Sequence, residues 1–210
     1  MSKRNIDYTL YICTDSGLMS SATVEQSVEA VLMGGATVVQ LREKNLTTRE
    51  LCELAERIKA VTDRYGVPLL INDRVDIALA VNAAGVHLGQ SDMPCRTARK
   101  LLGGDKIIGI TAPTVELAKK AQEDGADYIG VGAMFTTFTK SDAKANTKEN
   151  LAGIRTAVDI PIVIIGGVKR SNVLTFAGMG IDGAAVISDI IADPDPENAA
   201  AQMKKIMEDF

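Results

Sequence analysis

The stretch TVVQLREKNLTTRELCELAERIKAVTDRYGVPLLI, residues 37–71, carries one repeat of the pattern that predicts the fold. It opens with an apolar run, Thr37–Leu41, and passes through charged residues into Thr48–Tyr65, where apolar residues recur at helical spacing. A second apolar run, Pro68–Ile71, follows. The stretch therefore predicts a strand, a helix and another strand, which is the repeating unit of a parallel sheet.

The same alternation continues along the chain. Nearly continuous apolar runs, typical of strands buried on both faces, predict eight strands: Tyr8–Cys13, Thr37–Leu41, Pro68–Ile71, Gly85–Leu88, Lys106–Ile110, Asp127–Val131, Ile160–Ile165 and Gly183–Ile187. Amphipathic patterns predict helices over Glu25–Met33, Thr48–Tyr65, Thr114–Asp124, Lys148–Val158, Ser171–Met179 and Pro196–Met207. Eight strands are enough to close a barrel, so we expect an α/β fold, a single (β/α)8 TIM-barrel domain over residues 1–210. An open doubly wound sheet is the alternative, but no G-x-G-x-x-G follows the first strand.

Composition narrows the function classes. The 210 residues are 46% hydrophobic and 24% charged, with a formal net charge of −4, as in an ordinary globular protein. Without a basic cluster, a nucleic-acid partner is not expected. The N-terminus is polar, and the longest apolar stretch, Ile160–Val168, is too short to span a bilayer. We therefore expect a cytoplasmic protein without a membrane partner, its three cysteines reduced, and leave homo-oligomer assembly open.

Active sites of such barrels lie at the carboxyl ends of the strands, and polar residues stand there in this sequence. Arg42 and Lys44 follow the strand that carries Gln40, and both can project toward the barrel mouth. Two cations in that place suit a diphosphate ligand. The alternative is a solvated loop face.

Two carboxylates follow neighbouring strands, Asp73 after the third and Asp92 after the fourth. They should converge at the rim, where two carboxylates together with substrate phosphates are the usual ligands of Mg²⁺. Either residue alone could instead cap a helix.

A phosphate site is expected after the last two strands. Gly166-Gly167 allows close approach of backbone N–H groups, and Ile187-Ser188 follows the eighth strand, the arrangement by which barrels bind phosphate. Turn glycines are the alternative. The stretch Thr137-Phe138-Thr139-Lys140 supplies hydroxyls and a cation, as a phosphate-contacting lid does. His87, the single histidine, could be structural or catalytic.

Several of these segments resemble the thiamine phosphate synthase family. They occur in the family's order and cover most of the chain: Val39–Lys44, Ile71–Arg74, Gly85–Asp92, Asp127–Gly132, Thr137-x-Thr139-Lys140 and Ile165–Gly167. The resemblance implies a transferase of thiamine biosynthesis that joins hydroxymethylpyrimidine diphosphate to hydroxyethylthiazole phosphate with release of pyrophosphate.

Site roles also follow from the resemblance. It implies that Asp73 and Asp92 hold Mg²⁺, and that Gln40 lies near the pyrimidine. The diphosphate is expected to contact Arg42, Lys44, Asn72 and Lys140, of which Arg42, Lys44 and Lys140 would assist catalysis. Thr137, Thr139, Gly167, Ile187 and Ser188 would place the thiazole phosphate. Thr111 stands where the family commonly has Ser and keeps a hydroxyl.

Three rival functions make different demands on the residues. A thiazole tautomerase-like isomerase on the same barrel needs neither the Arg42/Lys44 pair nor two metal-binding aspartates. A Schiff-base aldolase needs a lysine inside a strand, but Lys44 and Lys140 lie in predicted loops. A non-catalytic phosphate-binding barrel is distinguished from an enzyme only by assay.

Overall fold

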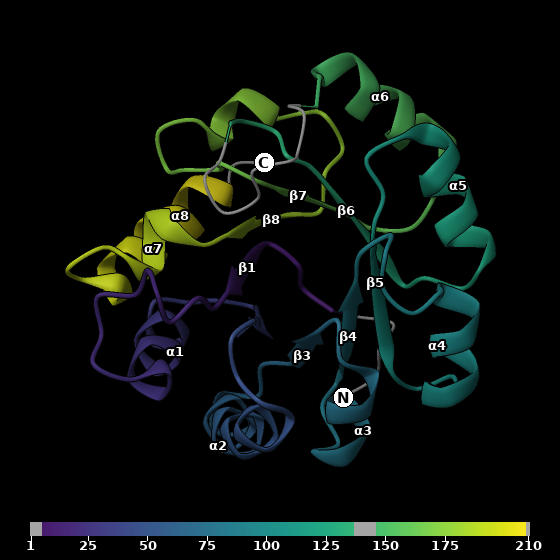
Figure 1. Ribbon diagram of the computed structural model, residues 1–210. Helices are drawn as coiled ribbons and strands as arrows, with labels where there is room; N and C mark the ends of the chain where they lie inside the picture. Colours follow the sequence, from purple (N-terminus) through teal and green to yellow (C-terminus); the bar gives the residue numbers. More distant parts are fainter. Residues whose placement is uncertain (1–5, 137–145, 209–210) are drawn as a thin grey trace.

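The structure of the chain is a computed structural model that describes residues 6–136 and 146–208. Its strands pair in chain order, all parallel, and β8 closes on β1, so the predicted barrel is confirmed and the open sheet is excluded. The strands are β1 (Leu10–Cys13), β2 (Val38–Leu41), β3 (Leu69–Asn72), β4 (Gly85–Leu88), β5 (Ile107–Thr111), β6 (Tyr128–Val131), β7 (Ile162–Ile165) and β8 (Gly183–Val186). Helices surround this barrel (Figure 1).

The helices differ from prediction in several places. They are α1 (Val24–Met33), α2 (Thr48–Tyr65), α3 (Val75–Ala80), α4 (Cys95–Leu102), α5 (Val115–Glu123), α6 (Lys148–Ala157), α7 (Ser188–Ile191) and α8 (Pro196–Met207), with a 3-10 helix η2 (Val173–Phe176). The prediction of a helix over Ser171–Met179 was wrong. Only the 3-10 helix η2 forms in this segment, and Gly178 and Gly180, with φ of 74° and 71°, then turn the chain. Apolar periodicity did not reveal α3 and α4, which are short, or α7, a single turn.

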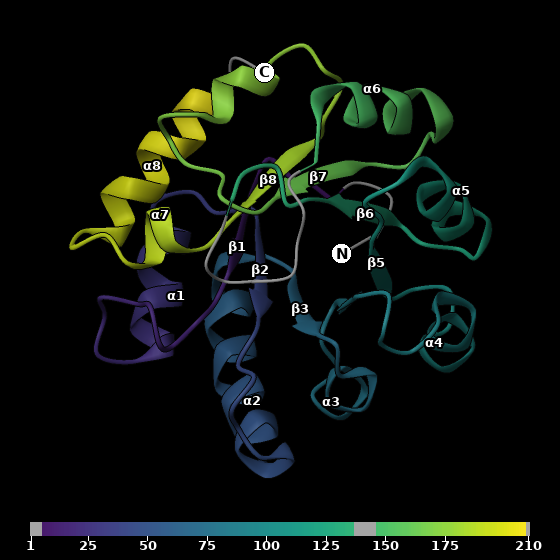
Figure 2. The same ribbon diagram turned by 45° about the horizontal axis from the view of Figure 1, so that its top comes forward.

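The longest helix shows why the repeat quoted first folds as predicted. Thr47 and Glu50 form a reciprocal capping box at the start of α2. Leu51, Leu54 and Ile58 recur on one face and are buried, so this stripe packs toward the strands. The helix stands beneath β2 and β3 in the tilted view (Figure 2). A strand is thereby followed at once by a well-capped helix, and the connecting residues 42–47 are left at the barrel mouth.

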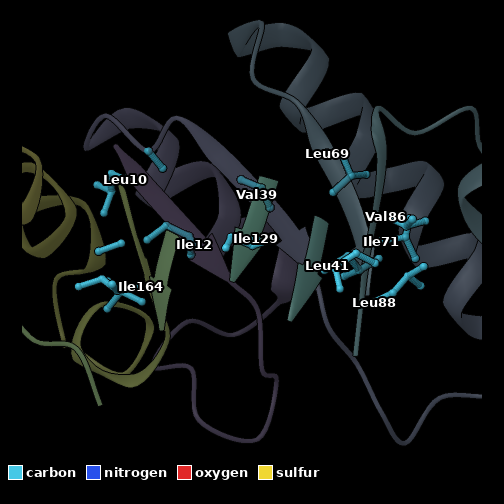
Figure 3. Packing of buried hydrophobic residues seen from close by; sticks show 14 of the residues in the cluster. Leu10, Ile12, Val39, Leu41, Leu69, Ile71, Val86, Leu88, Ile129 and Ile164 are labelled. Atoms are coloured by element: carbon cyan, nitrogen blue, oxygen red, sulfur yellow. The ribbon is translucent and has the colours of Figure 1, made fainter. Parts of the chain in front are cut away.

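The core has two compartments, one on each face of the strands. Aliphatic side chains such as Ile12, Val39 and Ile129 pack between strands and helices (Figure 3). The other faces point into the barrel, and their cluster includes the aromatic residues Tyr8, Tyr11 and Tyr128. Alternate residues of a strand point to opposite faces, so both compartments draw on the same short segments. The interior compartment is the one that leads to the site.

Candidate active site

The closed parallel barrel brings the predicted strand-end residues to one rim. Because all strands run the same way, their carboxyl ends share one face of the barrel. The residues placed there within or directly after the strands are Gln40, Arg42, Lys44, Asn72, Asp73, Asp92, Thr111, Gly166, Gly167, Ile187 and Ser188. Thr137, Thr139 and Lys140 lie outside the described residues, and their roles stay predictions.

Asp73 and Asp92 converge, with Lys44 nearby. The pKa of the Asp73 carboxyl is raised to about 6, first by burial and then by the close approach of the Asp92 carboxyl, while the charge of Lys44 acts in the opposite direction. The backbone of Gly89 donates to Asp92 Oδ2 at 2.7 Å and holds that carboxylate in place. Two half-buried carboxylates and one ammonium group therefore share a single electrostatic environment.

Asp73 is held by an uncommon backbone conformation. Its φ is +62°, in the left-handed region that aspartate and asparagine tolerate better than most residues. Its backbone N–H donates to the carbonyl of His87 at 2.9 Å and continues the pairing of β3 with β4 beyond the strand ends. This conformation turns the chain directly after Asn72.

Arg42 is anchored by Asp15, a residue with no role among the sequence-based predictions. Arg42 Nη1 lies 3.0 Å from Oδ2 of Asp15, and the Arg42 side chain is 11% exposed. Thr14 accepts the backbone N–H of Arg42 and donates to Glu43 Oε1 at 2.8 Å. The loops after β1 and β2 are thus joined. Asp15 could have been found from the sequence, because it follows the first predicted strand just as Arg42 follows the second.

A chain of hydrogen bonds crosses the barrel interior below these charges. Gln40 Nε2 donates to the hydroxyl of Tyr11 at 2.6 Å, and this hydroxyl lies 2.8 Å from that of Tyr128. The Tyr128 hydroxyl is 2.8 Å from His87 Nδ1, and His87 Nε2 is 2.9 Å from Thr111 Oγ1. His87, whose role the sequence left open, therefore links the barrel interior to the rim.

Two glycines make room for this chain. A Cβ on Gly109 would lie 2.0 Å from the Tyr128 ring, and one on Gly130 would lie 3.0 Å from His87 Cε1. The first approach is impossible for a real side chain and the second is unusually tight, so glycine stands at both positions where the two rings pass.

The loops after β7 and β8 are tied together. Gly166 and Gly167 take φ values of 91° and 69°, and a Cβ on Gly167 would lie 2.7 Å from Cβ of Phe135. Arg170, three residues on, pairs with Asp189 of α7 at 3.0 Å. The Gly-Gly loop and the turn that begins at Ser188 are consequently held as one unit.

These features match a known pattern along nearly the whole chain. The sequence pattern of a family described as thiamine monophosphate synthase matches residues 10–190. The chain belongs to the thiamine monophosphate synthase family. The predicted class, a transferase of thiamine biosynthesis on a TIM barrel, is thereby confirmed.

Individual members of the family are close to this chain. A thiamine-phosphate synthase of Ruminiclostridium cellulolyticum is 52% identical over 204 residues, covering 97% of both chains. One of Clostridium beijerinckii is 50% identical over 202 residues, covering 96% of this chain and 97% of its own. The solved thiamine phosphate pyrophosphorylase from Pyrococcus furiosus superposes with a TM-score of 0.89 at 38% identity, covering 97% of this chain and 96% of its own.

A prominent hollow among the described residues lies elsewhere. A cavity of about 380 Å³ opens where the strands begin, lined among others by Lys59, Asn82 and Lys106. Lys106 is engaged there, since its Nζ donates to the carbonyl of Ala83 at 2.6 Å. Because active sites of (β/α)8 barrels lie at the carboxyl ends of the strands, the candidate site is the opposite rim and not this cavity.

The side chains set limits on a metal site and on membrane insertion. Among residues 6–136 and 146–208, no three His, Cys, Asp or Glu side chains gather as a set of metal ligands. In the same ranges, no helix has the length and apolar character to cross a bilayer.

Proposed function

We propose that the chain joins 4-amino-2-methyl-5-hydroxymethylpyrimidine diphosphate to 4-methyl-5-(2-hydroxyethyl)thiazole phosphate, giving thiamine phosphate and pyrophosphate. The observation that carries the proposal is the meeting of Asp73, Asp92 and Lys44 at the barrel rim. Burial and then the neighbouring Asp92 carboxyl raise the pKa of Asp73, so a bound cation is favoured between the two carboxylates, and the ammonium group of Lys44 beside them favours an anion. A metal–diphosphate ligand has both charges.

The residues fit Mg²⁺ through their hard oxygen donors. Asp73 and Asp92 would hold it, and their mutual repulsion would be relieved by it. When bound, Mg²⁺ supplies stabilisation of the negative charge that grows on the departing pyrophosphate.

The side chains of the protein would bind the diphosphate through their charge and hold the two substrates in position. Lys44 and Arg42 face the same negative charge from β2, and Asn72 from β3, while Gln40 contacts the pyrimidine from inside the barrel. Loss of pyrophosphate leaves a cation on the carbon attached to an electron-rich aminopyrimidine, and the thiazole nitrogen then attacks this carbon. Gly167, Ile187 and Ser188 would hold the thiazole phosphate in reach, and orientation of two substrates accounts for much of the rate. No protein nucleophile takes part.

Thr111 would complete the diphosphate side with its hydroxyl. We further propose that the enzyme works in the cytoplasm, where Cys13, Cys52 and Cys95, none of which forms a disulfide within the described residues, stay as thiols.

The test is an assay with purified protein, both phosphorylated substrates and Mg²⁺, in which thiamine phosphate and pyrophosphate are measured together. Equal amounts of the two products that disappear with a chelator, and return with added Mg²⁺, are expected. Isomerisation of a thiazole phosphate without pyrophosphate would favour the tautomerase instead, and binding of both ligands without any product would favour a non-catalytic barrel.

A further inference from the structure

With the Gln40 amide placed so that Nε2 faces the Tyr11 hydroxyl, the hydrogen bonds inside the barrel have one consistent direction. The Tyr11 hydroxyl accepts from Gln40 Nε2, and its two partners among the described residues are Gln40 and Tyr128. Its own proton must therefore go to the Tyr128 hydroxyl. If Tyr128 donated to Tyr11 instead, the proton of the fully buried Tyr11 hydroxyl would have no acceptor, which is costly in an apolar interior.

The direction of the Tyr11–Tyr128 hydrogen bond also decides which nitrogen of His87 carries the proton. Since Tyr128 accepts from Tyr11, its proton goes to His87 Nδ1, 2.8 Å away. A ring nitrogen that accepts carries no proton, so His87 is neutral with its proton on Nε2. That proton is donated to Thr111 Oγ1 at 2.9 Å. Thr111 keeps its hydroxyl proton for another acceptor.

Both ends of the chain open toward the barrel mouth. Each fully buried side-chain nitrogen or oxygen of the described residues has a hydrogen-bond partner, but Gln40 Oε1 accepts no hydrogen bond from them. This oxygen is therefore accessible although Gln40 is only 4% exposed. At the other end Thr111 is half-buried at the carboxyl end of β5.

We propose that Tyr11, Tyr128 and His87 are positioning residues that set the hydrogen-bond polarity of the site. They fix Gln40 so that Oε1 is presented as an acceptor, and they fix Thr111 so that its hydroxyl is presented as a donor. A ligand must then place a donor, such as an amino group, against Gln40 and an acceptor against Thr111. This extension to the ligand rests on the proposed function, in which an aminopyrimidine occupies this site.

The tautomer can be measured without any substrate. His87 is the single histidine of the chain, so its two ring ¹⁵N signals need no assignment by mutation. In the full-length wild-type protein above neutral pH, we expect the neutral ring with its proton on Nε2. Substitution Tyr128→Phe should remove this preference and give a mixture of tautomers. A proton found on Nδ1 in the wild type would mean that the hydrogen bonds run the other way, and would overturn the proposal.

Ligand selectivity supplies a readout that a merely structural role would not move. We expect the wild type to bind the aminopyrimidine diphosphate at least about tenfold more tightly than the analogue with a carbonyl in place of the amino group, because the latter cannot donate to Oε1. In Tyr128→Phe the Tyr11 proton can turn to Gln40, the amide can rotate, and the preference should fall to about threefold or less.

The matched control is Tyr8→Phe. Tyr8 is buried against Tyr128, with ring centroids 4.8 Å apart, but it makes none of the four hydrogen bonds of the chain. It should keep both tautomer and preference. If Tyr128→Phe does not fold, Tyr11→Phe serves in its place. Equal behaviour of the control and the test variant would overturn the proposal. Absence of synthase activity in the wild type would refute the proposed function alone, since the tautomer still decides the polarity.

Discussion

Arg42 Nη1 lies 3.0 Å from Oδ2 of Asp15, so the cation after β2 is oriented by a carboxylate after β1. An arginine has five N–H donors, and this contact leaves the others for a ligand. The arrangement assigns Asp15 a supporting task, because a long side chain that is already oriented loses less conformational entropy when it binds an anion.

Substitution Asp15→Asn should therefore weaken the enzyme without unfolding it. We expect kcat/KM for the pyrimidine diphosphate to fall about threefold to tenfold, since Arg42 loses its charged partner while the amide keeps one hydrogen bond. Steady-state kinetics would measure the change. Glu25→Gln breaks an exposed pair with Arg57 on the helical surface and should leave kcat/KM unaltered. If both variants matched the wild type, Asp15 would have no part in orienting Arg42.

Lys44→Met should have a larger effect. Lys44 is the cation whose charge reaches Asp73, so its loss removes stabilisation of the departing pyrophosphate beside the proposed metal. Electrostatic groups of this kind contribute about a hundredfold to a thousandfold in kcat. A single-turnover assay with pyrophosphate detection would measure this. Lys100→Met, at a lysine on the outer helix α4, is the control. Wild-type turnover in Lys44→Met would contradict the assignment.

Asp73 should make stability depend on pH in a defined direction. Its folded-state pKa of about 6 lies above the ordinary value of 3.8, so between these values the folded protein binds more protons than the unfolded chain. Its contribution to the free energy of unfolding therefore falls as pH rises through this window, and the destabilisation is fully present above the folded-state pKa.

Asp73→Asn removes that contribution and keeps a residue that tolerates positive φ. In metal-free protein at about pH 7.5 the variant should be more stable than the wild type by about 1 to 2 kcal/mol, discounted from the full linkage because Asp73 is partly exposed. The difference should shrink toward about pH 4. Urea unfolding of both proteins in chelator across this range measures the difference, in which other titrating groups cancel. A constant difference would show that Asp73 ionises normally.

Gly167→Ala tests the loop after β7. It adds a Cβ at a φ of 69° and at 2.7 Å from Cβ of Phe135, so both backbone strain and a side-chain collision arise. We expect thermal unfolding to show a loss of about 2 to 4 kcal/mol. Gly178→Ala is a matched control, because its φ is 74° but the added Cβ meets nothing within 4 Å. It should lose only about 1 kcal/mol. Equal losses of stability in the two variants would show that Phe135 moves aside without lowering the free energy of unfolding.

Much of the rim could be predicted from the sequence because barrel geometry converts chain order into position. Once the third and fourth apolar runs are recognised as neighbouring parallel strands, the residues that follow them must meet, and Asp73 and Asp92 do. Gln40 and Lys44 were placed at the rim in the same way. Asp15 could have been placed at the rim by the same reasoning, but the sequence did not show that Arg42 is its partner.

The barrel interior was harder to predict. Tyr11 and Tyr128 are 117 residues apart, and within their apolar strands each looks like any other buried residue. Their contact depends on strand tilt and register, which periodicity does not encode. Short helices were missed for a different reason: α3 has six residues, too few for an apolar period to repeat. Thr137, Thr139 and Lys140 stay predictions.

The close packing of the Tyr128 ring against Gly109 ties two positions of the chain together in evolution. Because any Cβ at position 109 would strike the Tyr128 ring, a larger residue there is acceptable only if residue 128 shrinks, and such a change would also sever the link to His87. In related sequences, the residues at positions 109 and 128 should therefore change together. Stabilising designs that repack this barrel need to treat them as one unit.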